Sequence, residues 1–199
     1  MSSHYFIDDE TLASNPKRFT YYFKSREYTF VTDAGVFSPD AIDGNTALML
    51  RHIDLPRRDK PRGRLLDMGC GYGCIGILLG GEYGLDVTQV DVNPRAVRLT
   101  EENAKLNGVV TRAFVSDCYS AVEGCFDTIV INPPIHAGKD VMYAMYEGAP
   151  EHLVTGGRLY TVLLKKHGAE SAAKKLREVF GNCETVYKEK GCFVFRCTK

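Results

Sequence analysis

An Asn-Pro-Pro sequence at residues 132–134 directly follows the apolar run 127–131. Two consecutive prolines remove two N–H donors and fix the backbone, which leaves two acceptors, the side-chain oxygen of Asn132 and the carbonyl of Pro133. These acceptors suit a planar amino group, which has two N–H bonds to donate. An exocyclic base amine or a side-chain amide is a poor nucleophile because its lone pair is delocalised. Acceptors aimed at its protons favour a pyramidal nitrogen, so the motif predicts transfer chemistry that depends on positioning and electrostatics.

A glycine-rich segment lies upstream at residues 67–76. Glycines between a strand and a helix let the backbone approach a ligand closely. The spacing Gly71-x-Gly73-x-x-Gly76 matches the dinucleotide fingerprint of nicotinamide enzymes. The overlapping spacing Asp67-x-Gly69-x-Gly71-x-Gly73 is the form used for S-adenosylmethionine. The segment therefore predicts a cofactor site and leaves two cofactors open, with a ligand-free strand–helix turn as the alternative.

Two aspartates end or follow the next two apolar runs. The carboxylate of Asp91 is placed to accept hydrogen bonds from both hydroxyls of a ribose, in either cofactor, or to cap the helix that begins near Pro94. Asp117 is placed to accept from an adenine amino group or to cap a turn. We include the neighbouring residues Asn93 and Cys118 in the predicted cofactor site.

Strands and helices alternate from Arg64 onward. Apolar strands are predicted at 64–68, 86–92, 112–116, 127–132, 158–164, 183–188 and 191–197, and helices at 74–81, 94–107, 140–152 and 168–180. This order predicts an α/β fold with a Rossmann-like, doubly wound, seven-stranded and mostly parallel sheet. The last two strands lack a helix between them, so the C-terminal end is predicted to be antiparallel. Ligands bind beyond the carboxyl ends of parallel strands, so the glycines, the aspartates and Asn132 are expected to face one crevice.

The N-terminal part has a different pattern. Residues 19–32 predict a β-hairpin, and a helix is expected through residues 47–50. The segment 56–64 is rich in proline and charge, which makes it the best candidate boundary. We therefore predict a hairpin and helix extension at 1–55 and an α/β domain at 56–199.

Composition excludes several classes of protein. The chain has 199 residues, with 25 Lys and Arg against 25 Asp and Glu, so its zero formal charge argues against binding of polyanions through bulk charge. It has no apolar run long enough for a membrane span and no signal-peptide pattern at its start. Seven cysteines in such a chain predict reduced thiols and a cytoplasmic protein. Cys70 and Cys74 have no second pair of ligands nearby, so no metal site is expected.

The motifs also resemble a known family. Residues 67–73 together with Asn-Pro-Pro are similar to class I S-adenosylmethionine-dependent amino-methyltransferases. The longer run 132–139, with Gly-Val-Phe-Ser at 35–38 and Asp43-Gly44, resembles the ribosomal RNA guanine-N2 methyltransferases of the C type, or methyltransferase small domain family. The resemblance extends over about residues 15–197. It implies S-adenosylmethionine as the cofactor and RNA as the partner, with guanine N2 of 16S ribosomal RNA as the target.

The resemblance also implies roles for residues at matching positions. The cofactor site would comprise Asp67, Gly69, Gly71, Gly73, Asp91, Asn93, Asp117, Cys118 and Asn132. The catalytic residues would be Asn132, Pro133, Pro134 and Ile135. Substrate would contact Phe37, His136, Lys139 and Lys165, and the segment 37–43 would cover the cofactor and the target base.

Two features depart from the family pattern. Many relatives have an aromatic residue after the prolines, which stacks on the target base, whereas this chain has Ile135. Stacking contributes about 1–3 kcal/mol per base, so base selection would depend on Phe37 or His136 instead. Longer members also carry a second, degenerate copy of the domain that helps to bind RNA, and 199 residues leave no room for it.

Charge is uneven along the chain. Residues 158–199 carry ten Lys and Arg against four Asp and Glu, and the segment 51–64 is also basic. Lys139 and Lys165 are expected beside the crevice, where they would contact phosphates. Lys174, Lys175 and Arg177 fit the solvated face of a helix better.

Three other functions are compatible with parts of the pattern. Release-factor glutamine methyltransferases also use Asn-Pro-Pro, but usually with tyrosine next and a helical N-terminal domain. A catalytically silent RNA-binding scaffold would not need Asp67, Asp91 and Asn132, which are all present. A nicotinamide oxidoreductase has no use for Asn-Pro-Pro.

Overall fold

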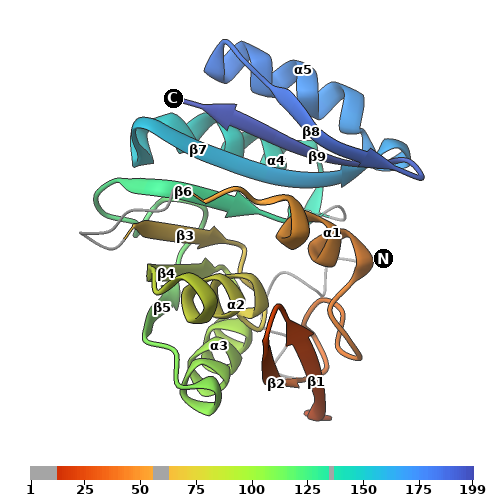
Figure 1. Cartoon of the computed structure of the whole chain (residues 1–199), viewed down its shortest axis with the longest axis vertical. Coiled ribbons are helices and arrows are strands. Elements are labelled where there is room, and N and C mark those ends of the chain that lie inside the picture. The colour runs from red at the N-terminus through yellow and green to blue at the C-terminus, as the bar shows by residue number, and fades with distance from the viewer. Residues whose placement is uncertain (1–12, 56–62, 135–136) are drawn as a thin grey trace.

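The computed structural model describes residues 13–55, 63–134 and 137–199. A seven-stranded sheet runs through the molecule, and a separate two-stranded hairpin lies at one side of it next to α3 (Figure 1). The sheet has the strand order β5-β4-β3-β6-β7-β9-β8. From β3 the chain proceeds in one direction across the sheet to β4 and β5, and then in the other direction to β6 and β7. The reversal places a topological switch point beside β3, where doubly wound sheets bind ligands.

Five strands pair in parallel: β3 (Arg64–Met68), β4 (Asp86–Asp91), β5 (Thr111–Val115), β6 (Phe126–Ile131) and β7 (Leu153–Leu164). Strand β9 (Cys192–Thr198) is antiparallel to both of its neighbours, β7 and β8 (Glu184–Glu189). The predicted seven-stranded, mostly parallel sheet with an antiparallel C-terminal strand is therefore confirmed.

Helices cover both faces of the sheet. They are α1 (Gly44–His52), α2 (Cys74–Tyr83), α3 (Pro94–Asn107), α4 (Lys139–Gly148) and α5 (Ala169–Phe180), with short 3-10 turns η2 (Ala149–His152) and η3 (Lys165–His167). Alternate residues of one strand enter different cores because successive side chains point to opposite faces. Leu65 packs with α1, α2 and the hairpin, whereas Leu66 packs with α4 and α5.

The helix predicted at 140–152 and the strand predicted at 158–164 have different bounds. Helix α4 ends at Gly148, where a side chain would meet the ring of Tyr119 at 2.5 Å, and η2 follows. Strand β7 begins at Leu153, five residues before its predicted start. Its pairing with β6 is irregular around Gly156, which has a φ of 77°. The two glycines at 156 and 157 interrupt the apolar pattern by which strands are identified.

The hairpin consists of β1 (Lys17–Phe23) and β2 (Arg26–Thr32). Its aromatic side chains reach the glycine-rich segment. The ring of Tyr72 packs against Phe19 and Phe30, with centroids 6.0 and 5.8 Å apart. Tyr72 is buried by these contacts, so the hairpin supports the loop that follows β3.

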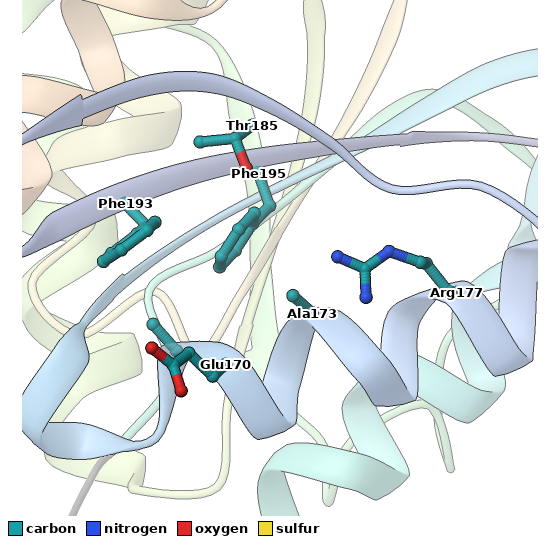
Figure 2. A pocket seen from close by; sticks show the side chains of 7 residues that line it. Glu170, Ala173, Arg177, Thr185, Phe193 and Phe195 are labelled. Atoms are coloured by element: carbon teal, nitrogen blue, oxygen red, sulfur yellow. The ribbon is translucent and has the colours of Figure 1, made fainter.

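A pocket of about 260 Å³ lies between α5 and strands β8 and β9. Figure 2 shows Phe193 and Phe195 on the strand side, with Glu170 and Arg177 projecting from the helix. None of the residues that line it belongs to the predicted site. Within the described part of the chain, no helix is long and apolar enough to cross a membrane. The same residues include no group of three or more His, Cys, Asp or Glu arranged to hold a metal ion.

Candidate active site

The predicted site residues lie at one edge of the sheet. Asp67 is in β3, Asp91 is the last residue of the adjacent β4, and Asn132 directly follows β6 on the other side of β3. Because these strands are parallel neighbours, their carboxyl ends meet at the same edge. Asp117 follows β5, which is two strands from β3, and Lys165 follows β7, which is one strand beyond β6.

The loop after β3 is held by main-chain hydrogen bonds. The N–H groups of Gly69 and Cys70 both donate to the Val90 carbonyl, at 2.8 and 2.9 Å. Gly71 has a φ of 59°, and a Cβ added there would meet no described atom within 4 Å. A Cβ on Gly76, by contrast, would lie 2.6 Å from the side chain of Gln89. The last glycine of the segment thus serves close packing of α2, whereas the loop around Gly71 presents open backbone to a ligand.

Asp67 is fully buried beneath this loop. Its Oδ2 accepts from the N–H of Gly76 at 2.9 Å and from Nε2 of Gln89 at 3.0 Å. Its Oδ1 has no hydrogen-bond partner among the described residues. Burial raises the pKa of Asp67 to about 7, although both hydrogen bonds oppose that shift.

Gln89 was not identified from the sequence. Its Nε2 donates to the Gly73 carbonyl at 3.0 Å as well as to Asp67, and its Oε1 accepts from the hydroxyl of Thr111 at 3.1 Å. One side chain therefore ties the start of α2 to strands β3 and β5. The available signal was a glutamine inside the apolar run of β4, where an unpaired polar group would be costly.

Both oxygens of Asp91 are oriented by the backbone. Oδ2 accepts from the N–H of Gly71 and Oδ1 from the N–H of Asn93, each at 2.9 Å. Burial raises the pKa of Asp91, and these two hydrogen bonds counteract it. The alternative that Asp91 caps α3 is wrong, because Asn93 is the cap and accepts from the N–H of Arg95 at 2.9 Å. The Asp91 carboxylate keeps lone pairs for a second set of donors, such as a ribose diol.

Asp117 and Cys118 lie in a tight turn after β5. The hydroxyl of Ser116 donates to the Cys118 carbonyl at 2.7 Å, and the N–H of Ser120 donates to the Asp117 carbonyl at 3.0 Å. Cys118 has a φ of 45°, and the side chain of Asp117 is exposed. Burial and the neighbouring Asp117 carboxylate raise the pKa of the Cys118 thiol, so it is neutral at ordinary pH.

Asn132 is held by residues at the start of α1. Its Nδ2 donates to the hydroxyl of Thr46 at 2.8 Å and lies 3.4 Å from Oδ2 of Asp43. Pro133 is buried and Pro134 is half-buried. Ile135 and His136, predicted as catalytic and substrate-binding residues, lie outside the described residues. Thr46 was not identified from the sequence, although Asp43-x-x-Thr46 is a recognisable helix start.

The loop before α1 lies against the end of β4. The Gly35 carbonyl accepts from Nδ2 of Asn93 at 3.3 Å, and the Ala34 carbonyl accepts from the guanidinium of Arg95 at 2.9 Å. Phe37 is 57% exposed in this loop. Lys139 is exposed at the first residue of α4, and Lys165 forms an exposed ion pair with Glu170 at 3.4 Å.

Comparison with known proteins identifies the family. The model of the methyltransferase small domain family matches residues 27–196, which include all but the first residue of the hairpin strand β2, the glycine loop and Asn-Pro-Pro. The chain belongs to the methyltransferase small domain family. The family and the fold class expected from the motifs are thereby confirmed.

Individual relatives of this methyltransferase small domain protein fall into two groups. The uncharacterized protein YbxB of Bacillus subtilis is 37% identical over 203 residues, which span the whole of both chains. The ribosomal RNA small subunit methyltransferase C of Aeromonas hydrophila is 39% identical over 141 residues, or 68% of this chain and 40% of that protein.

A solved structure is similar over most of the fold. It is a T. thermophilus 16S rRNA N2 methyltransferase, RsmC, in complex with AdoMet and guanosine. It superposes with a TM-score of 0.84 and 28% identity, over 94% of this chain and 52% of that one. The chain therefore spans about 40% to half of the length of these methyltransferase C relatives.

Proposed function

We propose that the protein is an S-adenosylmethionine-dependent N-methyltransferase that modifies the exocyclic N2 amine of a guanine in 16S ribosomal RNA. The observation that carries this proposal is the orientation of Asn132. Its side-chain nitrogen is engaged by Thr46, so its oxygen remains to accept an N–H from a substrate amine. The same edge of the sheet carries the glycine loop and Asp91.

The described residues fit the cofactor, S-adenosylmethionine. The carboxylate of Asp91 would accept from the ribose hydroxyls, and the open backbone around Gly71 would lie along the cofactor. The unpartnered Oδ1 of Asp67 adds a buried acceptor beneath the same loop. The bound cofactor supplies an activated methyl group on a sulfonium. The turn at Asp117 and Cys118, after β5, would hold the adenine end.

The remaining chemistry would belong to residues of this chain. Asn132 Oδ1 and the Pro133 carbonyl would hold the two N–H bonds of the target amine and keep its lone pair directed away from them. Once methylated, the nitrogen is positively charged and strongly acidic, so it would release one proton to water. The chain therefore needs well-placed acceptors more than a strong base. Holding the amine in this orientation also reduces the entropy cost of bringing two reactants together.

The substrate would approach from the loop that precedes α1 and from the ends of β6 and β7. Phe37 is exposed two residues after Gly35, whose carbonyl contacts Asn93, and its aromatic ring would stack on the target base. Lys139 and Lys165 lie after β6 and β7 and would contact phosphates. Residues 13–55 would thus form an extension that covers the active site. An enzyme with this substrate would work in the cytoplasm.

Radiolabelled methyl transfer tests the proposal. The protein would be incubated with labelled S-adenosylmethionine and with unmodified 30S subunits, naked 16S RNA or a release factor. We expect label in RNA, recovered as N2-methylguanosine after digestion to nucleosides. Asn132→Ala should reduce the rate by at least about tenfold, which corresponds to 1.4 kcal/mol in the transition state. Label only in protein, or binding of NAD without binding of S-adenosylmethionine, would overturn the proposal.

A further inference from the structure

Three polar side chains connect the first turn of α1 to Asn132. Oδ1 of Asp43 accepts from the N–H groups of Asn45 and Thr46, at 2.9 and 3.3 Å, and so caps the helix. Oδ2 of Asp43 accepts from the hydroxyl of Thr46. The hydroxyl oxygen of Thr46 in turn accepts from Nδ2 of Asn132 at 2.8 Å. Thr46, the middle member, is buried, and Asp43 and Asn132 are partly buried.

The chemistry of the three groups allows only one direction of donation. An ionised carboxylate only accepts, so the single proton of the Thr46 hydroxyl must point to Asp43. The hydroxyl oxygen then has only lone pairs to offer to Asn132. Asn132 must therefore present its NH2 group to Thr46, which turns its oxygen toward the other side. The two ends of an amide have nearly the same shape, so packing alone would not select between them.

We propose that Asp43 and Thr46 are positioning residues that fix the amide orientation of Asn132 for methyl transfer. The inference rests on the proposed function, because it assigns Asn132 Oδ1 to the target amine. In the opposite orientation, the NH2 of Asn132 would face the N–H bonds of the substrate, and donor would oppose donor. The carboxylate at the far end also polarises the hydrogen-bonded chain, which strengthens Oδ1 as an acceptor.

Three substitutions distinguish a change in the amide orientation of Asn132 from a general loss of stability. Thr46→Val keeps the shape of Thr46 but removes its hydroxyl. Thr46→Ser keeps the hydroxyl. Asp43→Asn keeps an effective helix cap, yet its NH2 group would donate to Thr46, so the Thr46 proton would turn to Asn132 and favour the flipped amide. Thr128→Val removes a different buried hydroxyl, in β6, and serves as the matched control for stability.

Steady-state kinetics are the first measurement. We expect Thr46→Val and Asp43→Asn to lower kcat by at least about tenfold, with little change in the KM for S-adenosylmethionine. Their melting temperatures should fall no further than that of Thr128→Val. Thr46→Ser should recover most of the kcat that Thr46→Val loses. If kcat of both Thr46→Val and Asp43→Asn stays within about twofold of the wild type, the positioning role is wrong even though the enzyme is active.

A second measurement does not depend on activity. The side-chain amide hydrogens of Asn132 can be followed by 15N NMR and assigned by their loss in Asn132→Asp. In the wild type, one hydrogen should exchange at least about tenfold more slowly than in Thr46→Val, because it is held by a buried hydroxyl. Equal exchange in both proteins would overturn the inference. A wild type that methylates no RNA would overturn the proposed function alone, since the exchange result would still decide the orientation.

Discussion

Asn103 on α3 pairs with the peptide groups of Val31 in β2 as a neighbouring strand would. The Val31 N–H donates to Oδ1 of Asn103 at 2.7 Å, and Nδ2 of Asn103 donates to the Val31 carbonyl at 2.8 Å. Asn107, one helical turn later, repeats this pairing with Thr29 at 2.9 and 2.7 Å. One turn of helix and two residues of strand have similar lengths. The side-chain amides of Asn103 and Asn107 can therefore pair with the main-chain N–H and C=O groups at the outer edge of β2.

The same amide links the hairpin to the cofactor loop. Nδ2 of Asn103 also donates to the Tyr72 carbonyl at 2.9 Å, in the glycine-rich segment, and Asn103 is fully buried. Asn103→Ala would leave the main-chain groups of Val31 and Tyr72 without partners. We expect the free energy of unfolding to fall by about 2–4 kcal/mol, since each buried unsatisfied group costs about 1–3 kcal/mol.

Urea denaturation measures this effect, and Glu102→Ala, an exposed position on the same helix, is its control. Affinity for S-adenosylmethionine should fall with Asn103→Ala and stay unchanged with Glu102→Ala, because Asn103 donates to the loop at Tyr72 whereas the Glu102 side chain is exposed. A loss of stability below about 0.5 kcal/mol, the range of ordinary surface substitutions, would contradict the bridging role.

Asp91→Asn should weaken binding of S-adenosylmethionine by at least about tenfold. The carboxylate already accepts from the N–H groups of Gly71 and Asn93, and an amide would place an NH2 against one of these donors. It would also remove one acceptor from the ribose hydroxyls. Titration calorimetry measures the affinity, with Asp86→Asn at the exposed start of β4 as the matched control. Equal affinities for both variants would exclude Asp91 from the cofactor site.

The raised pKa of Asp67 should make the free energy of unfolding depend on pH. Burial raises its folded pKa to about 7 from 3.8, so between these values the folded state binds more protons than the unfolded state. Stability from this group is therefore complete below about pH 4 and is lost as pH rises to about 7, by up to about 4 kcal/mol at 1.36 kcal/mol per pH unit.

The variant Asp67→Asn isolates this contribution, since its oxygen can still accept from Gly76 and Gln89. We expect the difference in the free energy of unfolding, wild type minus variant, to decrease steadily from pH 4 to pH 7. Urea denaturation at several pH values measures the difference. A difference that rises with pH would mean that the carboxylate is stabilised as the anion.

Local patterns predicted most of this fold because strands and helices repeat with their own periods. Short apolar runs located β3 and β6, and the last two strands were recognised as a hairpin because no helix separates them. Gln89, Thr46 and Asn103 were missed for a common reason. Gln89 and Asn103 are polar residues inside otherwise apolar or amphipathic elements, so they appear in the sequence only as interruptions, and Thr46 appears only as part of a helix start. The meaning of each depends on a partner far along the chain, such as Asn132 for Thr46, and no local period encodes that contact.

Lys165, directly after β7, and Lys190, in the β8–β9 turn, should contribute to RNA affinity rather than to the methyl-transfer step. The N–H of Lys165 donates to the Gly191 carbonyl at 2.7 Å, which places η3 beside the β8–β9 turn that contains Lys190. Both side chains are exposed, at 67% and 89%, and their partners Glu170 and Glu189 are exposed as well. Replacing both lysines by alanine should weaken RNA binding and lower the slope of log affinity against log salt by about 1.4–1.8, since each phosphate contact contributes about 0.7–0.9.

Filter binding over a range of salt concentrations measures that slope. Lys174→Ala on α5 is the control, because Lys174 is exposed on the helix beside Glu178 and was assigned to a solvated face. The rate at saturating RNA should change little in the double variant, since neither lysine would touch the amine. If the control lowers the slope as much as each of the two lysines does, RNA follows α5 rather than the β8–β9 turn, and the proposed path past the end of β7 is wrong.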